Sequence, residues 1–290
     1  MLGYACINET LRSQKPSVMV NRTVRKINVN IGKISELALK NIEDFYKILE
    51  WNEENKIYFY RMSSDMFPWA SEYDFWDLDT VESIQEVFTK IKQNFSHHRL
   101  TFHPGPFNKP GSPNPDIVMN TIYDLNIHGT IMDMLDLPRS PYAKINIHVG
   151  GVYDDKKETL KRFKDFLKHP KLFDSVKSRI TVENDDKLKG YSLLDLYEAD
   201  LGIPLVFDYH HHKFNHSMTT EENALKMAIE TWPAGITPIV HYSESSDVKK
   251  PVAHSDYIEN KIETYGLNLD IMIEAKKKEL TLLKYREKYG

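Results

Sequence analysis

Histidines and carboxylates recur along this sequence directly after short apolar runs. Six successive runs deliver such a residue, in the order His103, His148, Glu183, Asp208, His241 and Glu274. Imidazole and carboxylate together suit Zn²⁺, Mn²⁺ or Fe²⁺, and a single cysteine excludes zinc sites built from several thiolates. If these groups lay close together without a cation, the charged ones would repel one another and their burial away from water would be unfavourable. The pattern therefore predicts metal-dependent chemistry.

One carboxylate stands in the middle of the series and could serve two ions. Glu183 is flanked on both sides by segments that carry possible ligands, which makes it the candidate bridge. Two divalent ions about 3.5–4 Å apart can clamp the attacking and leaving oxygens of a phosphoryl displacement. His254 could complete a further site with His211. Any one of these histidines is more often structural, so the prediction depends on their joint occurrence.

The elements that must position these residues alternate between two kinds of segment. Helical spacing of apolar residues separates short apolar runs that are typical of buried strands. Seven helical segments are expected, around residues 39–49, 81–95, 117–135, 160–167, 193–199, 224–229 and 280–285. The expected strands are Leu2–Cys6, Ile57–Met62, Leu100–Phe102, Ile145–Val149, Ile180–Val182, Pro204–Phe207, Pro238–Val240 and Ile271–Ile273.

Eight strands in this alternation predict an α/β fold, a (β/α)₈ TIM barrel in which residues 1–290 form a single domain. The carboxyl ends of the strands meet at one mouth of such a barrel, so the six segments would bring their ligands together there. A doubly wound open sheet is the rival fold. It would normally offer a glycine-rich phosphate turn after an early strand, and the sequence has none.

Composition and charge narrow the class of protein. With 41% hydrophobic and 28% charged residues, the chain is typical of a soluble globular protein. We expect an intracellular protein without a membrane partner, because there is no apolar run of about 18 residues and no secretory leader. The net charge of −4 gives no reason by itself to expect nucleic acid. Residues 1–33 are nevertheless basic, with Arg12, Lys15, Arg22, Arg25, Lys26 and Lys33 against Glu9.

At these residues the chain resembles the UV damage endonuclease family, which is related to endonuclease IV and to the sugar isomerase barrels. The resemblance runs from Leu2 to about Glu274, and its motifs are specific in their order and spacing. They are Leu2-Gly3-Tyr4-Ala5-Cys6-Ile7-Asn8, Asn21-Arg22-Thr23, Tyr60-Arg61-Met62-Ser63-Ser64, Phe67-Pro68, His103-Pro104-Gly105, Asn146-Ile147-His148-Val149-Gly150-Gly151, Glu183-Asn184-Asp185, Asp208-x-x-His211-His212, Val240-His241-Tyr242-Ser243 and His254-Ser255-Asp256.

The resemblance implies incision of double-stranded DNA immediately 5′ to a UV photoproduct, a cyclobutane pyrimidine dimer or a 6-4 photoproduct, leaving a 3′-hydroxyl and a 5′-phosphate. It implies up to three divalent ions, with Mn²⁺ the expected metal and Zn²⁺ the alternative, and we expect a monomer. Glu183, His241 and Tyr4 are the implied catalytic residues. The implied ligand sets are His103, His148 and Glu183 for one ion, Glu183, Asp208, His241 and Glu274 for a second, and His211 and His254 for a third.

Contacts with DNA also follow from the resemblance. Tyr4 and Asn8 match positions near the damaged nucleotides or the scissile phosphate, and Arg22 belongs to the basic residues expected to follow the phosphates. Pro106-Phe107 stands where the family typically has a polar–aromatic pair, and Phe107 is the expected apolar wedge. Ile239 occupies a position where the family has a lysine, two residues before His241.

Three alternative functions are considered beside the UV damage endonuclease. An abasic-site endonuclease of the endonuclease IV type could have the same barrel and ligands. A metal-dependent sugar isomerase or epimerase could too, but it needs neither a basic N-terminal loop nor a wedge at the mouth. A damage-binding protein without catalysis would not need the metal ligands. Three divalent ions would add about +6 at the mouth, which would outweigh the net charge of −4.

Overall fold

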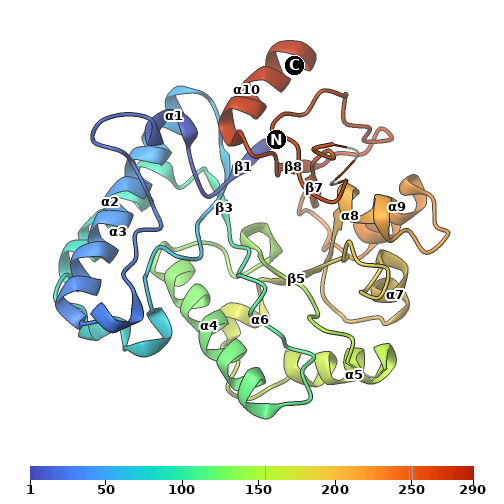
Figure 1. The fold of residues 1–290 in the computed structure, drawn as a ribbon, viewed down its shortest axis with the longest axis horizontal. Helices are drawn as coiled ribbons and strands as arrows, with labels where there is room; N and C mark the ends of the chain where they lie inside the picture. The colour runs from blue at the N-terminus through green and yellow to red at the C-terminus, as the bar shows by residue number, and fades with distance from the viewer. Residues whose placement is uncertain (154, 248, 250) are drawn as a thin grey trace.

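The computed structural model describes residues 1–153, 155–247, 249 and 251–290 (Figure 1). Eight parallel strands form one sheet in the order β3-β2-β1-β8-β7-β6-β5-β4, which curls into a nearly closed barrel. The strands are β1 (Leu2–Ala5), β2 (Phe59–Arg61), β3 (Arg99–Thr101), β4 (Ile145–Ile147), β5 (Ile180–Glu183), β6 (Leu205–Asp208), β7 (Ile239–Tyr242) and β8 (Asp270–Ile273). The predicted TIM barrel is confirmed, and each observed strand overlaps its predicted segment.

The barrel closes weakly between its two edge strands. Neighbouring strands elsewhere share two to four register pairs, whereas β3 and β4 meet only at an isolated bridge between Phe102 and Ile145. The amide of Phe102 donates to the carbonyl of Lys144 at 2.9 Å, and its carbonyl accepts from the amide of Asn146 at 3.0 Å. This seam lies between the strands that precede His103 and His148.

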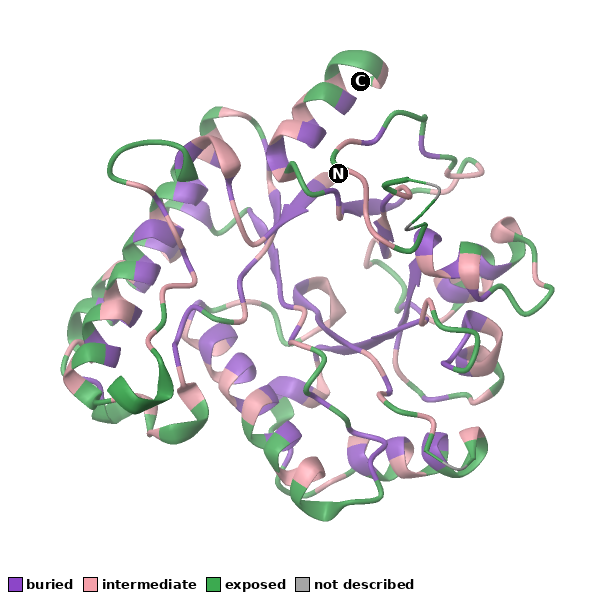
Figure 2. Ribbon diagram, viewed as in Figure 1, coloured by how far each residue is buried: buried purple, intermediate pink, exposed green. Residues whose placement is uncertain are grey.

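Helices surround the sheet and cover its outer face (Figures 1 and 2). The predicted helical segments correspond to α2 (Ile31–Glu54), α3 (Val81–Phe95), α4 (Pro115–Met134), α5 (Lys156–Leu167), α7 (Leu193–Glu198), α9 (Glu221–Glu230) and α10 (Lys278–Tyr289). The short helices α1 (Glu9–Arg12), α6 (Asp174–Lys177) and α8 (Tyr209–Phe214) were not predicted. Four residues are too few for an apolar periodicity to show in α1 and α6, and three of the six residues of α8 are histidines.

Local sequence signals fix where several helices begin. Asn30 and Asn114 accept backbone hydrogen bonds at the starts of α2 and α4, and Pro115 occupies the first turn of α4, where its missing N–H costs nothing. Asp208 caps α8 by accepting from the amide of His211 at 2.7 Å. The cap turns the chain sharply at the end of β6 and fixes both residues at the barrel mouth.

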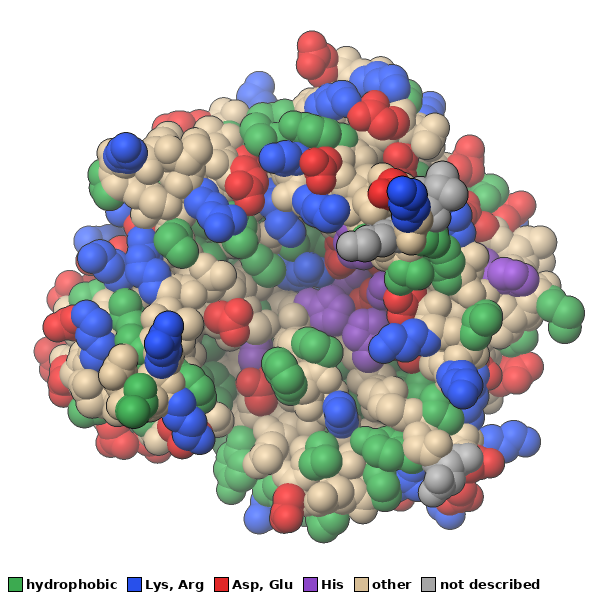
Figure 3. Space-filling model, in the orientation of Figure 1, with side chains coloured by type: hydrophobic (Ala, Val, Ile, Leu, Met, Phe, Trp, Pro, Cys, Tyr) green, Lys and Arg blue, Asp and Glu red, His purple; other side chains and the backbone are tan. Residues whose placement is uncertain are grey.

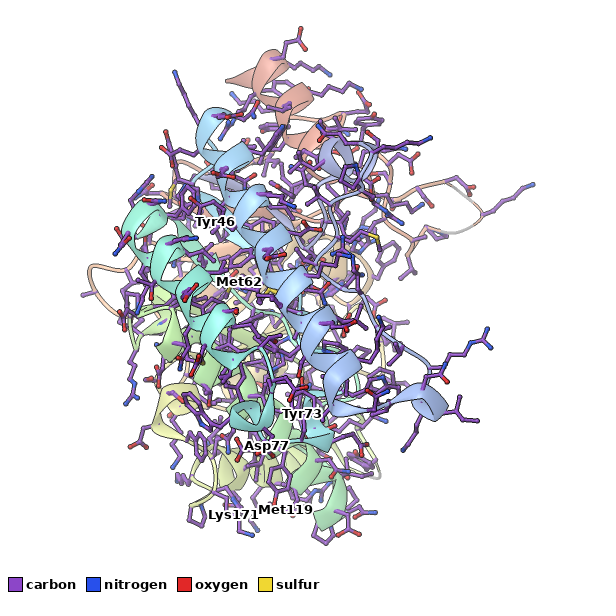
Figure 4. The ribbon with its side chains drawn as sticks, turned by 90° about the vertical axis from the view of Figure 1, so that its left-hand side faces the viewer. Tyr46, Met62, Tyr73, Asp77, Met119 and Lys171 are labelled. Carbon is purple, nitrogen blue, oxygen red and sulfur yellow. The ribbon has the colours of Figure 1, made fainter. Side chains whose placement is uncertain are left out.

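Helices α2 and α3 pack against each other on the outside of the barrel. Figure 4 shows α2 and α3 side by side, with Tyr46 among the residues labelled on this face. The ring of Tyr46 lies 5.3 Å from that of Phe95, and its hydroxyl accepts from Asn94 at 2.8 Å. Purple stretches on the inner sides of the helices in Figure 2 mark residues that are buried between helices and sheet. Among the described residues, no helix is long and apolar enough to span a membrane.

Candidate metal centre

The strand ends bring histidines and carboxylates from across the chain to one place. Figure 3 looks at this face of the molecule and shows histidine side chains gathered in the hollow at its centre. Three groups of possible ligands lie there, each with ligand atoms within 4.8 Å of one another. They are His103 with Glu183 and His241, His148 with Glu183 and His211, and Asp208 with His241 and Glu274.

Glu183 is the residue that the first two groups share. It ends β5 with an exposed fraction of 1%. Its Oε2 lies 3.1 Å from His103 Nε2 and 3.0 Å from His241 Nδ1, and its Oε1 lies 3.3 Å from His211 Nδ1. Asn146 donates a hydrogen bond to the same carboxylate and holds it in place. This central position is the one expected of the candidate bridge.

His241 joins the remaining carboxylates to the same cluster. Its Nδ1 is 3.1 Å from Glu274 Oε1, and Glu274 in turn forms an ion pair with Arg61 of β2. Asp208 completes this group from the end of β6, fully buried. The ring centroids of His103 and His148 are 5.3 Å apart, yet these two residues fall into different groups. Asp208, His241 and Glu274 thus lie together as in the predicted second set, whereas His103 and His148 of the first set fall into different groups.

His254 lies beside the cluster rather than within one of its groups. Its Nδ1 is 2.7 Å from the carbonyl oxygen of Glu274, and its ring is 5.2 Å from that of His210. Among the residues that the structure describes, none of the groups of possible ligands includes His254, and His211 is grouped with His148 instead. The ligand role of His254 stays a prediction.

Burial and charge move the pKa values of the clustered groups in opposite directions. Burial lowers the pKa of His103 to about 4, although Glu183 favours its protonated form. Burial also opposes protonation of His211, but the charges of Asp208 and Glu183 raise its pKa to about 10. Burial raises the pKa of Asp208 to about 6. Such divergent shifts among neighbouring groups are typical of a functional site.

Several buried atoms of the cluster have no hydrogen-bond partner among the described residues. They include His103 Nδ1, His241 Nδ1 and Asp208 Oδ2. The ring nitrogens of His103 and His241 lie about 3 Å from Glu183 Oε2 without the alignment of a hydrogen bond. This arrangement is expected of ligand atoms that share a cation. Nitrogen and oxygen donors of this kind suit Mn²⁺ or Zn²⁺. The residues present therefore fit a cluster of divalent ions.

Two basic side chains lie against the cluster, and the sequence analysis assigned no role to either. Arg61 is paired with Glu274, and Lys144 Nζ lies 3.0 Å from His241 Nε2. Burial lowers the pKa of Lys144 to about 7. Lys144 directly precedes β4, whereas Ile239, the position where the family has a lysine, lies on β7 with His241. The amine of Lys144 therefore approaches His241 from a different strand. The position of Lys144 directly before an apolar strand was the one feature of the sequence that could have indicated this contact, but a lysine at such a position usually points to solvent.

Tyr4 and Asn8 are buried in this structure, and their predicted contact with DNA stays a prediction. Their exposed fractions are 0% and 1%. The Tyr4 hydroxyl donates to Asn52 Oδ1 at 2.7 Å and accepts from Asn8 Nδ2 at 3.0 Å, while Asn8 also caps α1. Burial raises the pKa of Tyr4, which keeps the phenol protonated. In this structure the two residues anchor the N-terminal loop.

Arg22 is also held within the protein. Its guanidinium pairs with Asp44 of α2 at 2.5 Å and donates to backbone carbonyls of the same loop, and 19% of its side chain is exposed. Arg12 is more open, at 49% exposed, and makes a 3.4 Å contact with Glu9. The predicted phosphate contact of Arg22 would require it to leave Asp44, because a guanidinium paired with a carboxylate offers few free donors.

Phe107 has the exposure that a wedge needs. It is 88% exposed, and Pro106 before it is also exposed. Pro106 lines a cavity of about 660 Å³ that also contacts His148 and His211. The lining also includes Lys109, Tyr153, Lys187 and Lys189, which the sequence analysis did not single out, and the acidic Asp185 and Asp186. The cavity thus joins the candidate metal centre to a surface that carries lysines, aspartates and one tyrosine.

Comparisons with known proteins agree with this arrangement. The family model described as UV-endonuclease UvdE matches residues 1–289. The UV-damage endonuclease of Schizosaccharomyces pombe (strain 972 / ATCC 24843) is 37% identical over 99% of this chain and 50% of its own length. The chain therefore spans about half the length of that curated relative.

Solved structures show the same fold. The crystal structure of SacUVDE superposes with a TM-score of 0.86 at 27% identity and covers 99% of this chain and 96% of its own. Endonuclease IV from Thermus thermophilus has a TM-score of 0.60 at 11% identity, covering 99% of this chain and 97% of its own, which shows a shared barrel fold. On the match across residues 1–289 and the identity to the curated relative, the chain belongs to the UV-endonuclease UvdE family.

Proposed function

We propose that this protein is a metal-dependent DNA repair endonuclease that acts on double-stranded DNA immediately 5′ to UV photoproducts, both cyclobutane pyrimidine dimers and 6-4 photoproducts. Incision would leave a 3′-hydroxyl and a 5′-phosphate. The observation that carries the proposal is Glu183, shared by imidazoles at the mouth of the barrel in a chain of the UvdE family. We further propose that residues 1–290 act as one domain, as a monomer, inside the cell.

The proposed ligands are the residues of the three groups, with Glu183 and His241 each shared by two of them. Mn²⁺ is the proposed ion and Zn²⁺ the alternative. Divalent ions at such a site supply Lewis acidity toward the phosphate oxygens and lower the pKa of water. His254 remains a proposed additional ligand. Its Nδ1 contacts the carbonyl of Glu274, so Nε2 is the ring nitrogen that would bind an ion.

The chain's own residues have three tasks in this proposal. Glu183 and His241 bring a carboxylate and an imidazole to the floor of the mouth, where water is largely excluded because both are buried. Arg61 offsets the charge of Glu274 and keeps that carboxylate oriented. Asn146 orients Glu183 by donating to its carboxylate. Fixed donors of this kind hold a reacting group in place without reorganisation during the reaction.

The cavity beside His148 and His211 is the proposed place for the damaged nucleotides. Lys109, Lys187 and Lys189 would attract phosphates, and Tyr153 offers an aromatic ring for stacking. Phe107 at the rim would unstack the duplex. Damaged bases are already poorly stacked and paired, so extruding them costs less than extruding normal ones, which favours the lesion.

The decisive experiment is incision of a UV-irradiated duplex oligonucleotide with Mn²⁺, beside an undamaged duplex and a duplex with an abasic site. We expect a nick 5′ to the dimer with 3′-hydroxyl and 5′-phosphate ends. No nick by fully metal-loaded protein would refute the proposal. Preferred cutting of the abasic duplex would instead favour an endonuclease of the endonuclease IV type.

Variants separate catalysis from binding in the same assay. If the protein only bound damaged DNA, His241→Ala would behave like the unmodified chain. We expect His241→Ala to lose incision and to retain part of its affinity for DNA, because His241 is buried and does not face the proposed DNA surface.

A further inference from the structure

A second set of metal-binding side chains lies at the end of the barrel opposite the mouth. Glu53 belongs to the last turn of α2, and His97 and His98 precede β3. The Nε2 atoms of both histidines lie 2.8 Å from the same oxygen of Glu53, Oε2. All three ligand atoms lie within 4.8 Å of one another.

This set is separate from the candidate metal centre. His98 and His103 lie at opposite ends of β3, and at about 3.3 Å per residue the five intervening steps correspond to roughly 16 Å along the strand. None of the three residues belongs to a group at the mouth. A ligand bound here would therefore take no direct part in the chemistry proposed above.

The surroundings hold the two imidazoles in position. His98 is buried with a side-chain exposure of 0%, and its ring packs against Phe95 and Tyr58 at 5.4 and 5.5 Å. The ring of His97 lies 5.4 Å from Tyr58 and 4.8 Å from His98, nearly perpendicular to it at 75°. Donors fixed by packing lose little conformational freedom when they bind an ion.

The protonation states suit a cation as well. Burial lowers the pKa of His98, so its imidazole is neutral near pH 7, and hydrogen bonding with His98 lowers the pKa of Glu53, which keeps the carboxylate charged. His98 Nδ1 is buried without a partner among the described residues, so neither tautomer gains a hydrogen bond on that side. Coordination of a metal through Nε2 would replace the contact of this atom with Glu53 and would place the ring proton on Nδ1.

We propose that Glu53, His97 and His98 form a site for one divalent ion of the zinc class, bound by two imidazole nitrogens and one carboxylate oxygen. Two of three donors are imidazoles, which favours Zn²⁺, Co²⁺ or Ni²⁺ over Mg²⁺ and Mn²⁺. The side chains of Glu53 and His97 are 41% and 51% exposed, so solvent can reach the site and fill the remaining coordination positions. The bound ion would join the end of α2 to the start of β3.

Metal counting on the whole protein tests this site. The full chain is stripped with a chelator, loaded with Co²⁺, desalted and analysed for metal per protein and for its visible absorption. His97→Ala is the test variant, because His97 is exposed and its loss leaves the packing of His98 intact. His169→Ala is the matched control, since His169 also lies just after a long helix and belongs to none of the metal-capable groups among the described residues.

We expect His97→Ala to bind one equivalent of Co²⁺ less than the unmodified chain and to lose one component of the absorption spectrum, with His169→Ala unchanged. Glu53→Ala should show the same loss as His97→Ala. Equal metal content and equal spectra in the unmodified chain and both test variants would overturn the proposal. Incision of UV-damaged duplex by His97→Ala should equal that of the unmodified chain, so this result stands apart from the proposed nuclease function.

Discussion

Replacement of Glu183 by glutamine tests the central feature of the candidate metal centre. Glutamine keeps the size of the side chain and one oxygen donor but removes the negative charge. The imidazole nitrogens of three histidines lie 3.0 to 3.3 Å from the Glu183 oxygens, so an ion held among these groups is within about 4 Å of the lost charge. An imidazole carries no negative charge, so the three histidines cannot replace the charge that is lost.

The size of the effect follows from Coulomb's law. Two unit charges 4 Å apart attract by about 4 kcal/mol at an effective dielectric constant of about 20. Each 1.4 kcal/mol corresponds to a factor of ten, so the affinity for at least one ion should fall by about 10³. We expect Glu183→Gln to bind fewer ions at micromolar metal and to lose incision while it retains part of its DNA affinity.

Isothermal titration with Mn²⁺, elemental analysis and the incision assay check this expectation. Glu279→Gln is the matched control, because Glu279 is also buried but accepts hydrogen bonds from the amides of Glu9 and Thr10 rather than facing the histidines. The control should keep its metal content. If Glu183→Gln bound the same number of ions with unchanged affinity and cut DNA normally, the assignment of Glu183 as the shared ligand would be wrong.

Three further outcomes are expected. Phe107→Ala should weaken incision of damaged duplex about thirtyfold, since a stacked ring is worth about 2 kcal/mol, and equal effects on single-strand binding would argue against the wedge. Removing Lys187 and Lys189 together should reduce the salt dependence of DNA binding by about one to two phosphate contacts, measured as the slope of log K against log salt. Burial opposes ionisation of Asp44, yet hydrogen bonds from Lys47, Met19 and Arg22 hold its pKa below the ordinary value. The lowered pKa means that this carboxylate stabilises the protein above about pH 4 and loses that contribution as the pH falls further. Asp44→Asn should therefore cost about 2 kcal/mol at pH 7 and progressively less in urea titrations at pH 4, 3 and 2.

The sequence was sufficient to predict the barrel, because most strands are short apolar runs buried on both faces and several intervening helices have one apolar stripe. It also predicted which strand ends meet, since the carboxyl ends of all eight strands share one mouth. The convergence of His103, Glu183 and His241 follows from that topology alone.

The division into ligand groups could not be predicted in the same way. It depends on side-chain rotamers, which turn His241 Nδ1 toward both Glu183 and Glu274 and leave Nε2 to Lys144. The burial of Tyr4 depends on Asn52, which lies 48 positions away on α2. Contacts of this kind arise from packing between distant segments, which no local pattern encodes.

The weak seam between β3 and β4 gives the candidate metal centre a mechanical consequence. His103 follows one strand of the seam and His148 follows the other, and both belong to groups that share Glu183 on β5. Ions held by these groups would link the two sides of the seam, where the backbones are joined by the two hydrogen bonds of Phe102. Loss of metal would then loosen the barrel wall itself, and the amides along β3 and β4 should exchange with solvent faster in the stripped protein than in the loaded one.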